Sequence, residues 1–115
     1  MPIPEKTVRA LDAALDKWVD GRGYLVPEDP SDAARRIGTT SALLSRYCRE
    51  VKGMDFKTIR RNLRIEDAKG LLLAHPEYTS SFVGRQVGIR DRSNFLNQFR
   101  AVTGMTPEEW RQRNS

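Results

Sequence analysis

The sequence predicts an all-α fold in which two copies of one helical motif are joined by a long linker helix. Apolar residues recur at helical spacing through residues 56–75, which predicts one continuous helix with a single buried side. Residues 49–54 and 35–38 reappear in similar form as residues 100–105 and 85–88. The offset is 51 residues for the first pair and 50 for the second, so the second copy has one extra residue in its turn or at its next helix start.

The amino-terminal part of the chain predicts one amphipathic helix and a loop. Residues 5–19 place apolar side chains on one face, and a glycine-rich turn at residues 20–23 ends the helix. Residues 24–26 form a short apolar anchor, and two prolines in residues 27–30 mark a loop. The apolar face of this helix needs a partner within the fold.

The first copy of the motif has the spacing of a helix-turn-helix. Ser31 is the expected N-cap of a helix over residues 32–37, and a second helix is expected over residues 41–52. Three positions carry the motif, namely a small residue where the helices cross, a glycine for a left-handed turn and an apolar anchor: Ala34, Gly38 and Leu44.

The second copy repeats this pattern. Its helices are expected over residues 80–87 and 91–103, with Gly84 and Gly88 in the places of the small residue and the turn glycine. Residues 106–109 then form a capping box with proline at the first helical position, which opens a last short helix. Seeing the motif twice makes the prediction specific.

The repeat also predicts the division of the chain. His75, directly before Pro76, ends the linker helix and is expected to serve its last carbonyls. We expect the first helix and the first helix-turn-helix in residues 1–54, the linker helix in residues 55–75, and the second helix-turn-helix with a C-terminal helix in residues 76–115. One such unit cannot bury a large core alone, so together they form one domain.

Basic residues gather in the part of the chain that carries the repeat. The net charge is +5, but residues 1–30 hold four basic and six acidic side chains, whereas residues 31–115 hold sixteen and nine. Fifteen of the twenty basic residues are Arg, which suits phosphate and guanine better than Lys does. A solvated basic surface is the alternative, but this placement favours a nucleic acid partner.

The composition excludes several classes of protein. One Cys and one His cannot assemble a structural zinc site, and a single Cys forms no disulfide within the chain. The chain has no Gly-rich phosphate loop and no nucleophile paired with a base, so we expect neither an enzyme nor a cofactor. It also has no apolar run of roughly 18 residues and no signal peptide, so we expect no membrane contact and a cytoplasmic location.

The sequence resembles the DNA-binding domain of the AraC/XylS family of bacterial transcription regulators. The resemblance covers about residues 5–111. It is carried by spaced residues of the second motif and the linker helix: Val87, Gly88, Ile89, Asp91, Ser93, Phe95, Phe99, Arg100, Gly104, Met105, Thr106, Pro107, Trp110 and Arg111, with Leu63, Arg64, Ile65, Ala68, Leu71 and Leu72. The family usually has Ala where Gly84 stands and an aromatic residue where Cys48 stands, so we expect looser packing there.

The resemblance implies seven helices, arranged as two homeodomain-like helix-turn-helix units joined by the linker helix. Each unit would place a recognition helix in successive major grooves of duplex DNA. A linker helix rising about 1.5 Å per residue is about 30 Å long, close to the DNA repeat of roughly 34 Å. Members commonly join this domain to a sensory or dimerisation module, so we expect a fragment of a larger regulator.

Candidate DNA contacts are the positions of the recognition helices that the core does not use. In the first unit the predicted base contacts are Ser41, Ala42, Ser45 and Arg46, and the predicted backbone contacts are Thr40 and Arg49. In the second unit they are Arg92, Ser93, Leu96 and Asn97, with Arg90 and Arg100 at the backbone. These positions match those that contact DNA in the family. Because Arg suits guanine and Asn suits adenine, we expect the second unit to carry at least half of the sequence information.

Arg64 matches an Arg of the family's linker helix, but neighbouring acids favour a structural ion pair over a base contact. Lys57, Arg60 and Arg61 are further candidates for phosphate contacts.

One competing hypothesis is a helical module that docks an acidic protein such as an RNA polymerase subunit. RNA binding is another, and it is weakened because no aromatic stacking surface is predicted at the outward positions.

Overall fold

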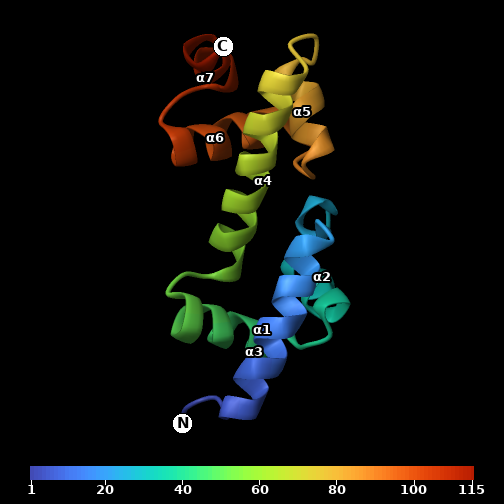
Figure 1. The fold of residues 1–115 in the computed structure, drawn as a ribbon, viewed down its shortest axis with the longest axis vertical. Coiled ribbons are helices and arrows are strands. Elements are labelled where there is room, and N and C mark those ends of the chain that lie inside the picture. The colour runs from blue at the N-terminus through green and yellow to red at the C-terminus, as the bar shows by residue number, and fades with distance from the viewer. The chain divides into compact units, whose positions relative to one another are not determined.

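The computed structural model describes residues 1–115 and consists of seven α-helices without a strand, which confirms the predicted fold class. Figure 1 shows the α-helices in chain order: α1 (Glu5–Asp20), α2 (Pro30–Ile37), α3 (Ser41–Tyr47), α4 (Phe56–Ala74), α5 (Ser80–Gln86), α6 (Arg92–Thr103) and α7 (Pro107–Asn114). A 3₁₀ turn covers Gly23–Leu25, and a π-helical turn covers Cys48–Lys52. None of these helices has the length and apolar character needed to cross a membrane.

The chain forms two compact units. The first unit consists of Met1–Tyr24 and Glu28–Arg60, and the second consists of Leu25–Pro27 and Arg61–Ser115. Each unit therefore contains one copy of the repeated motif, and each is described separately.

The core of the first unit is built on α1, which packs against both α2 and α3. Leu11, Leu15 and Trp18 are the buried residues of α1. The Trp18 ring lies 5.3 Å from the Phe56 ring and 6.0 Å from the Tyr24 ring, measured between centroids. The apolar face of the first helix thus finds its partner in the helix-turn-helix and in the residues that flank it.

Helix α2 begins earlier than expected, because Asp29 rather than Ser31 is its N-cap. The Asp29 carboxylate accepts hydrogen bonds from the Asp32 amide at 2.9 Å and from the Ser31 hydroxyl at 2.7 Å. These bonds lower the pKa of Asp29. Pro30 occupies the first helical position, where its missing N–H would have had no partner. The predicted N-cap at Ser31 is therefore wrong by two residues.

The core of the second unit gathers one face of α4 with the two helices of the second motif. Its buried members come from α4, α5, α6 and the turn between the last two: Ile65, Ala68, Leu72, Val83, Val87, Ile89, Phe95 and Phe99. The Phe99 ring contacts the rings of Phe95 and Trp110 edge-on, with centroids 5.8 and 6.0 Å apart. The aromatic stack joins α6 to α7.

The extra residue of the second copy lies in its turn. Gly38 and Gly88 both adopt left-handed backbone conformations, with φ of 100° and 89°. The N-caps of the following helices are Thr40 and Asp91. The N-cap follows the turn glycine by two residues in the first copy and by three residues in the second. The two helices that follow keep the 51-residue offset.

The end of α4 is capped by a residue from α7. Arg111 donates from Nε to the Leu72 carbonyl at 3.0 Å, and from Nη2 to the carbonyls of His75 at 3.3 Å and Tyr78 at 2.8 Å. His75 instead stacks on the Tyr78 ring, with centroids 4.3 Å apart. The expectation that the His75 side chain serves the last carbonyls of the helix is wrong, because the Arg111 guanidinium binds the Leu72 carbonyl together with those of His75 and Tyr78, which follow the helix.

Gly84 is a site of close packing, contrary to the expected loosening. A Cβ atom at this position would lie 2.8 Å from Cγ of Phe95 and 3.1 Å from the Ile89 carbonyl oxygen. The Phe95 ring fills the space that an alanine side chain would need. Cys48 is likewise fully buried, and burial raises the pKa of its thiol.

Candidate nucleic-acid interface

The first recognition helix is α3, and its inner side is fixed by the core. The Thr40 side chain accepts a hydrogen bond from the Leu43 amide at 3.2 Å, which caps the helix. Leu44 and Tyr47 are buried. The predicted contact residues take the remaining positions: Thr40, Ser41, Ala42 and Arg49 are exposed, and Ser45 and Arg46 are half-buried.

The α-helical hydrogen bonding of the first recognition segment stops earlier than predicted. Residues 41–52 were expected to form one regular helix, but the chain changes to a π-helical turn at Cys48. Gly53, with φ of 77°, ends this turn and donates its N–H to the Cys48 carbonyl. In the second unit α6 continues as an α-helix to Thr103. The two recognition segments are therefore equal in length but different in their last turns.

Arg46 forms an ion pair on the outer side of this segment. Its Nε donates to Oε2 of Glu50 at 2.8 Å, and the two side chains are 42% and 46% exposed. The partner lies four residues further along, the spacing at which helical side chains meet. Glu50 was absent from the predicted site, although this spacing is visible in the sequence.

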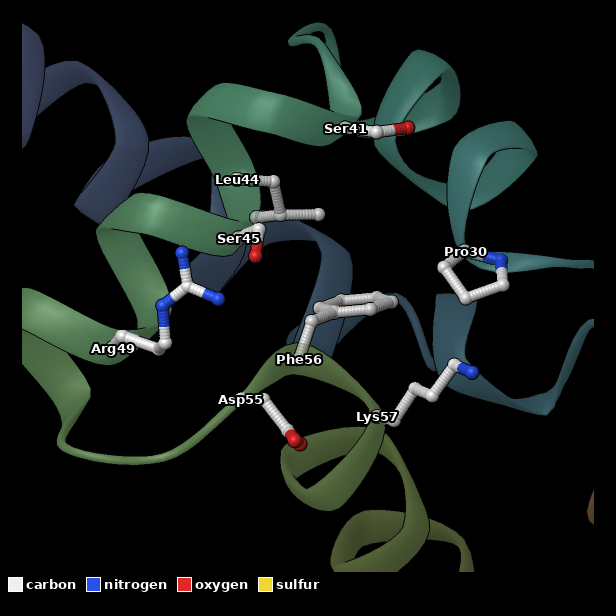
Figure 2. Close-up of a pocket in the computed structure, with 8 residues that line it drawn as sticks. All are labelled: Pro30, Ser41, Leu44, Ser45, Arg49, Asp55, Phe56 and Lys57. Atoms are coloured by element: carbon white, nitrogen blue, oxygen red, sulfur yellow. The ribbon is translucent and has the colours of Figure 1, made fainter.

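A pocket of about 290 Å³ lies beside α3. Its lining comes from α3, the start of α4 and neighbouring turns: Pro30, Ser41, Leu44, Ser45, Arg49, Asp55, Phe56 and Lys57. Figure 2 shows the Phe56 ring in the middle of this group, with Leu44 and Ser45 on one side and Lys57 on another. Asp55 accepts a hydrogen bond from the Thr58 amide at 2.9 Å. The cationic side chains of Arg49 and Lys57 thus border a pocket that the recognition helix helps to form.

The structure separates the three basic candidates at the start of α4. Lys57 is exposed and borders the pocket. Arg60 turns inward, donates to the Glu28 carbonyl at 2.7 Å and lies over the Phe56 ring at 5.5 Å, and burial lowers its pKa. Arg61, in the second unit, lies beside the side-chain oxygen of Asn62 at 3.4 Å. Lys57 is the candidate in the first unit that remains open to a phosphate.

The second recognition helix is α6, capped by Asp91. The Asp91 carboxylate accepts from the Asn94 amide at 2.8 Å, while Phe95 and Phe99 fill the core. The predicted contacts again lie on the outside: Arg90, Arg92, Ser93, Asn97 and Arg100 are exposed, and Leu96 is half-buried. No hydrogen bond or ion pair joins the Arg92 side chain to the rest of the protein. The whole Arg92 guanidinium can therefore contact a partner, whereas Nε of Arg46 is engaged by Glu50.

Arg64 has a structural position in the second unit. Its side chain is 7% exposed, and Nη2 donates to the Val26 carbonyl at 2.8 Å. The same guanidinium lies 3.1 Å from the place where a Cβ of Gly88 would be. This burial and the hydrogen bond to a backbone carbonyl give Arg64 a place in the interior of the second unit, and the predicted ion pair with neighbouring acids stays a prediction.

The structure therefore places all twelve predicted contact residues on exposed or half-buried positions, six in each unit. Their contacts with DNA stay a prediction. The chain also holds no cluster of His, Cys, Asp or Glu side chains that could bind a metal ion.

Known proteins are similar to this chain in sequence and in fold. The family described as "Helix-turn-helix domain" matches residues 33–113. The arabinose operon regulatory protein of Salmonella typhimurium is 32% identical over 83 residues, which are 72% of this chain and 29% of that protein. The chain thus spans less than a third of that relative's length.

Two solved structures show the same fold. The C-terminal domain of the two-component response regulator yesN from Fusobacterium nucleatum is 24% identical, with a TM-score of 0.77 over 90% of this chain and 98% of that one. The DNA-binding domain of AdpA, solved with a target DNA, is 19% identical, with a TM-score of 0.77 over 90% and 91%. The family match, the curated relative and the repeated motif lead to one conclusion: this chain belongs to the helix-turn-helix domain family, of the AraC type.

Proposed function

We propose that this chain is the DNA-binding part of a bacterial transcription regulator, and that it binds duplex DNA sequence-specifically with α3 and α6 in successive major grooves. The observation that carries the proposal is the repetition of one arrangement. In each unit a capped helix buries its apolar side and presents mostly polar side chains on its outer side. Helices of this kind enter the major groove, where base edges differ in their donors and acceptors.

The chemistry of the outer side chains suits this partner. Arg92 can bind guanine through O6 and N7, and Asn97 can bind adenine through N6 and N7. The exposed cations near each recognition helix would contact phosphates, which fix the register of a protein on the duplex. To the predicted backbone contacts we add Lys57, because it borders the pocket beside α3. The solved AdpA domain, whose fold is similar, binds a target DNA.

The rest of the regulator would lie outside this chain. Since the chain corresponds to 29% of its curated relative, we propose that the intact protein also has a sensory or dimerisation domain. It would act in the cytoplasm on bacterial DNA, without a catalytic step, and would contact RNA polymerase where it activates transcription.

Selection from a pool of random duplexes tests the proposal. We expect the isolated chain to retain an asymmetric site with two blocks of sequence information about one helical turn apart. Binding that depends on about six phosphates should weaken roughly a thousandfold between 50 and 200 mM salt. Retention of no sequence above background, at low as well as moderate salt, would contradict the proposal.

A protein partner is the second candidate. Val51 and Met54, at the end of the first motif, are large apolar side chains that are 43% and 41% exposed. Together with nearby Arg49 and Lys52 they would suit a surface that is both acidic and apolar. Such an interface should depend less on salt than DNA binding does. Duplex DNA of the selected sequence is then added to the complex with the protein partner. The DNA displaces the protein partner only if both bind the same surface of the chain.

A further inference from the structure

We infer that Glu50 is a positioning residue that sets the base specificity of Arg46. The inference rests on the proposed function and adds to it a residue that would touch neither base nor phosphate. It starts from a contrast between the two recognition helices. In the first unit the outward Arg is held by an acid, whereas in the second unit Arg92 has no partner in the protein.

The geometry of the pair leaves the reading end of Arg46 available. Glu50 accepts from Nε, the nitrogen nearest the aliphatic part of the side chain, at 2.8 Å. A guanidinium recognises guanine through two parallel N–H groups, and the Nη atoms can supply them while Nε stays engaged. One bond to Nε also restricts the rotation of the guanidinium plane. Glu50 would therefore orient Arg46 without occupying the atoms that read the base.

Stability does not account for this pair. Both side chains are more than two-fifths exposed, and exposed pairs at this spacing add little to folding. A carboxylate near a recognition helix also repels DNA phosphates, so it weakens binding to any sequence. The favourable effect that we infer lies in the conformation of Arg46, because a long side chain already ordered loses less entropy when it binds.

The repeat supplies an internal comparison. At the 51-residue offset Asn97 corresponds to Arg46, and Ala101 corresponds to Glu50. The second unit thus has neither the long cation nor its acid at these positions. A shorter amide has fewer rotatable bonds and needs no such support. The first copy has both the Arg and the acid at these two positions, and the second copy has neither.

The test compares Glu50→Ala and Glu50→Gln, each in the wild-type background and with Arg46→Ala. Affinity is measured at one salt concentration for the selected duplex, for its single-base variants and for an unrelated duplex. Glu5→Ala is the matched control, because Glu5 forms an exposed pair of the same spacing with Arg9 at 3.2 Å, on α1. Circular dichroism verifies that every variant is folded.

We expect Glu50→Ala to act in opposite directions on affinity and on specificity. Affinity for the unrelated duplex should rise about two- to fivefold, since a negative charge near the phosphates is lost. Discrimination at the base pair read by Arg46 should fall about three- to tenfold, the effect of leaving one long side chain unordered. Glu50→Gln should restore part of the discrimination, because its amide oxygen still accepts from Nε. Glu5→Ala should change neither.

Three outcomes would overturn the inference. Unchanged discrimination in Glu50→Ala would mean that the pair does not orient Arg46. An equal loss of discrimination in the Arg46→Ala background would mean that Glu50 acts by another route. Absence of binding to any duplex by the wild-type chain would overturn the proposed function and the inference together, whereas the first two outcomes leave the proposed function standing.

Discussion

The hydroxyl group of Tyr47 donates a hydrogen bond to Oδ1 of Asp12, and this bond joins the first recognition helix to α1. The two residues are 35 positions apart in the sequence. Tyr47 is fully buried, and burial, followed by the bond to Asp12, raises its pKa. Helix α1 therefore holds α3 through a polar contact as well as through the apolar core.

Removal of this hydrogen bond should destabilise the first unit in a pH-dependent way. Tyr47→Phe is expected to lower the free energy of unfolding by about 1–2 kcal/mol at neutral pH. Because the folded-state pKa lies above the ordinary value of 10.0, the wild-type bond stabilises below pH 10 and is lost as the pH rises further. Urea unfolding at pH 7 and above pH 10 measures both effects. Equal pH dependence in wild type and Tyr47→Phe would contradict the prediction, and Asp12→Asn, which keeps an acceptor, is the control.

Gly84→Ala should destabilise the second unit, although alanine favours helices. The new Cβ would lie 2.8 Å from Cγ of Phe95, and overpacking of a core typically costs about 1–3 kcal/mol, more than the roughly 1 kcal/mol gained in helix propensity. Gly70→Ala in α4 is the matched control, since outside its own stretch of helix backbone no atom lies within 4 Å of its Cβ position, and it should stabilise. Thermal unfolding of both variants measures the difference. An increase in stability for Gly84→Ala would show that Phe95 can move aside.

Substitution of Arg111 should release the end of α4. Arg111→Ala removes three hydrogen bonds from a charged donor to backbone carbonyls, and we expect a loss of about 1–3 kcal/mol in the free energy of unfolding. Arg111→Lys should recover only part of it, because an ammonium group cannot match the planar fork of a guanidinium. His75→Gln is the control, with an expected change within about 0.5 kcal/mol. A larger effect of His75→Gln than of Arg111→Ala would contradict this account of the helix end.

Substitutions of Lys57 and Arg60 should differ in their effect on the salt dependence of DNA binding. Lys57→Ala removes a proposed phosphate contact, so the slope of log affinity against log salt should fall by about 1 in magnitude. Arg60→Ala should keep the slope and lower stability instead, because its guanidinium is engaged by the Glu28 carbonyl. Titrations at several salt concentrations give both slopes. If the two variants change the slope equally, Lys57 has no special place at the interface.

The second unit should carry at least half of the sequence information. Arg92→Ala combined with Asn97→Ala should flatten one block of the selected site, since each good bidentate contact gives about 1–3 kcal/mol of discrimination. Arg46→Ala should flatten less of the other block, because its neighbours on α3 are Ser and Ala. Sequence logos selected with each variant allow the comparison. A greater loss of information for Arg46→Ala would assign the main reading role to α3.

Much of the fold follows from the sequence because its determinants are local. The side chains of the N-cap residues Thr40, Thr79 and Thr106 each accept a hydrogen bond from the amide three residues further along. A short stretch of sequence therefore contains both partners. The same holds for the left-handed turn at Gly38, whose position needs a residue without a side chain. The outward set could also be predicted, because helical spacing assigns Leu44, Phe95 and Phe99 to the core and leaves the predicted contact positions exposed or half-buried.

Only the tertiary structure determined which residues far apart in the chain form hydrogen bonds with each other. The bond between Tyr47 and Asp12 spans 35 residues, and the bonds from Arg111 to carbonyls at and just after the end of α4 span 33 to 39. Periodicity shows which side of a helix is buried, but it does not show which side chain of another helix meets it there. Buried donors and free carbonyls must be satisfied, and only the packed arrangement determines which residue is within reach.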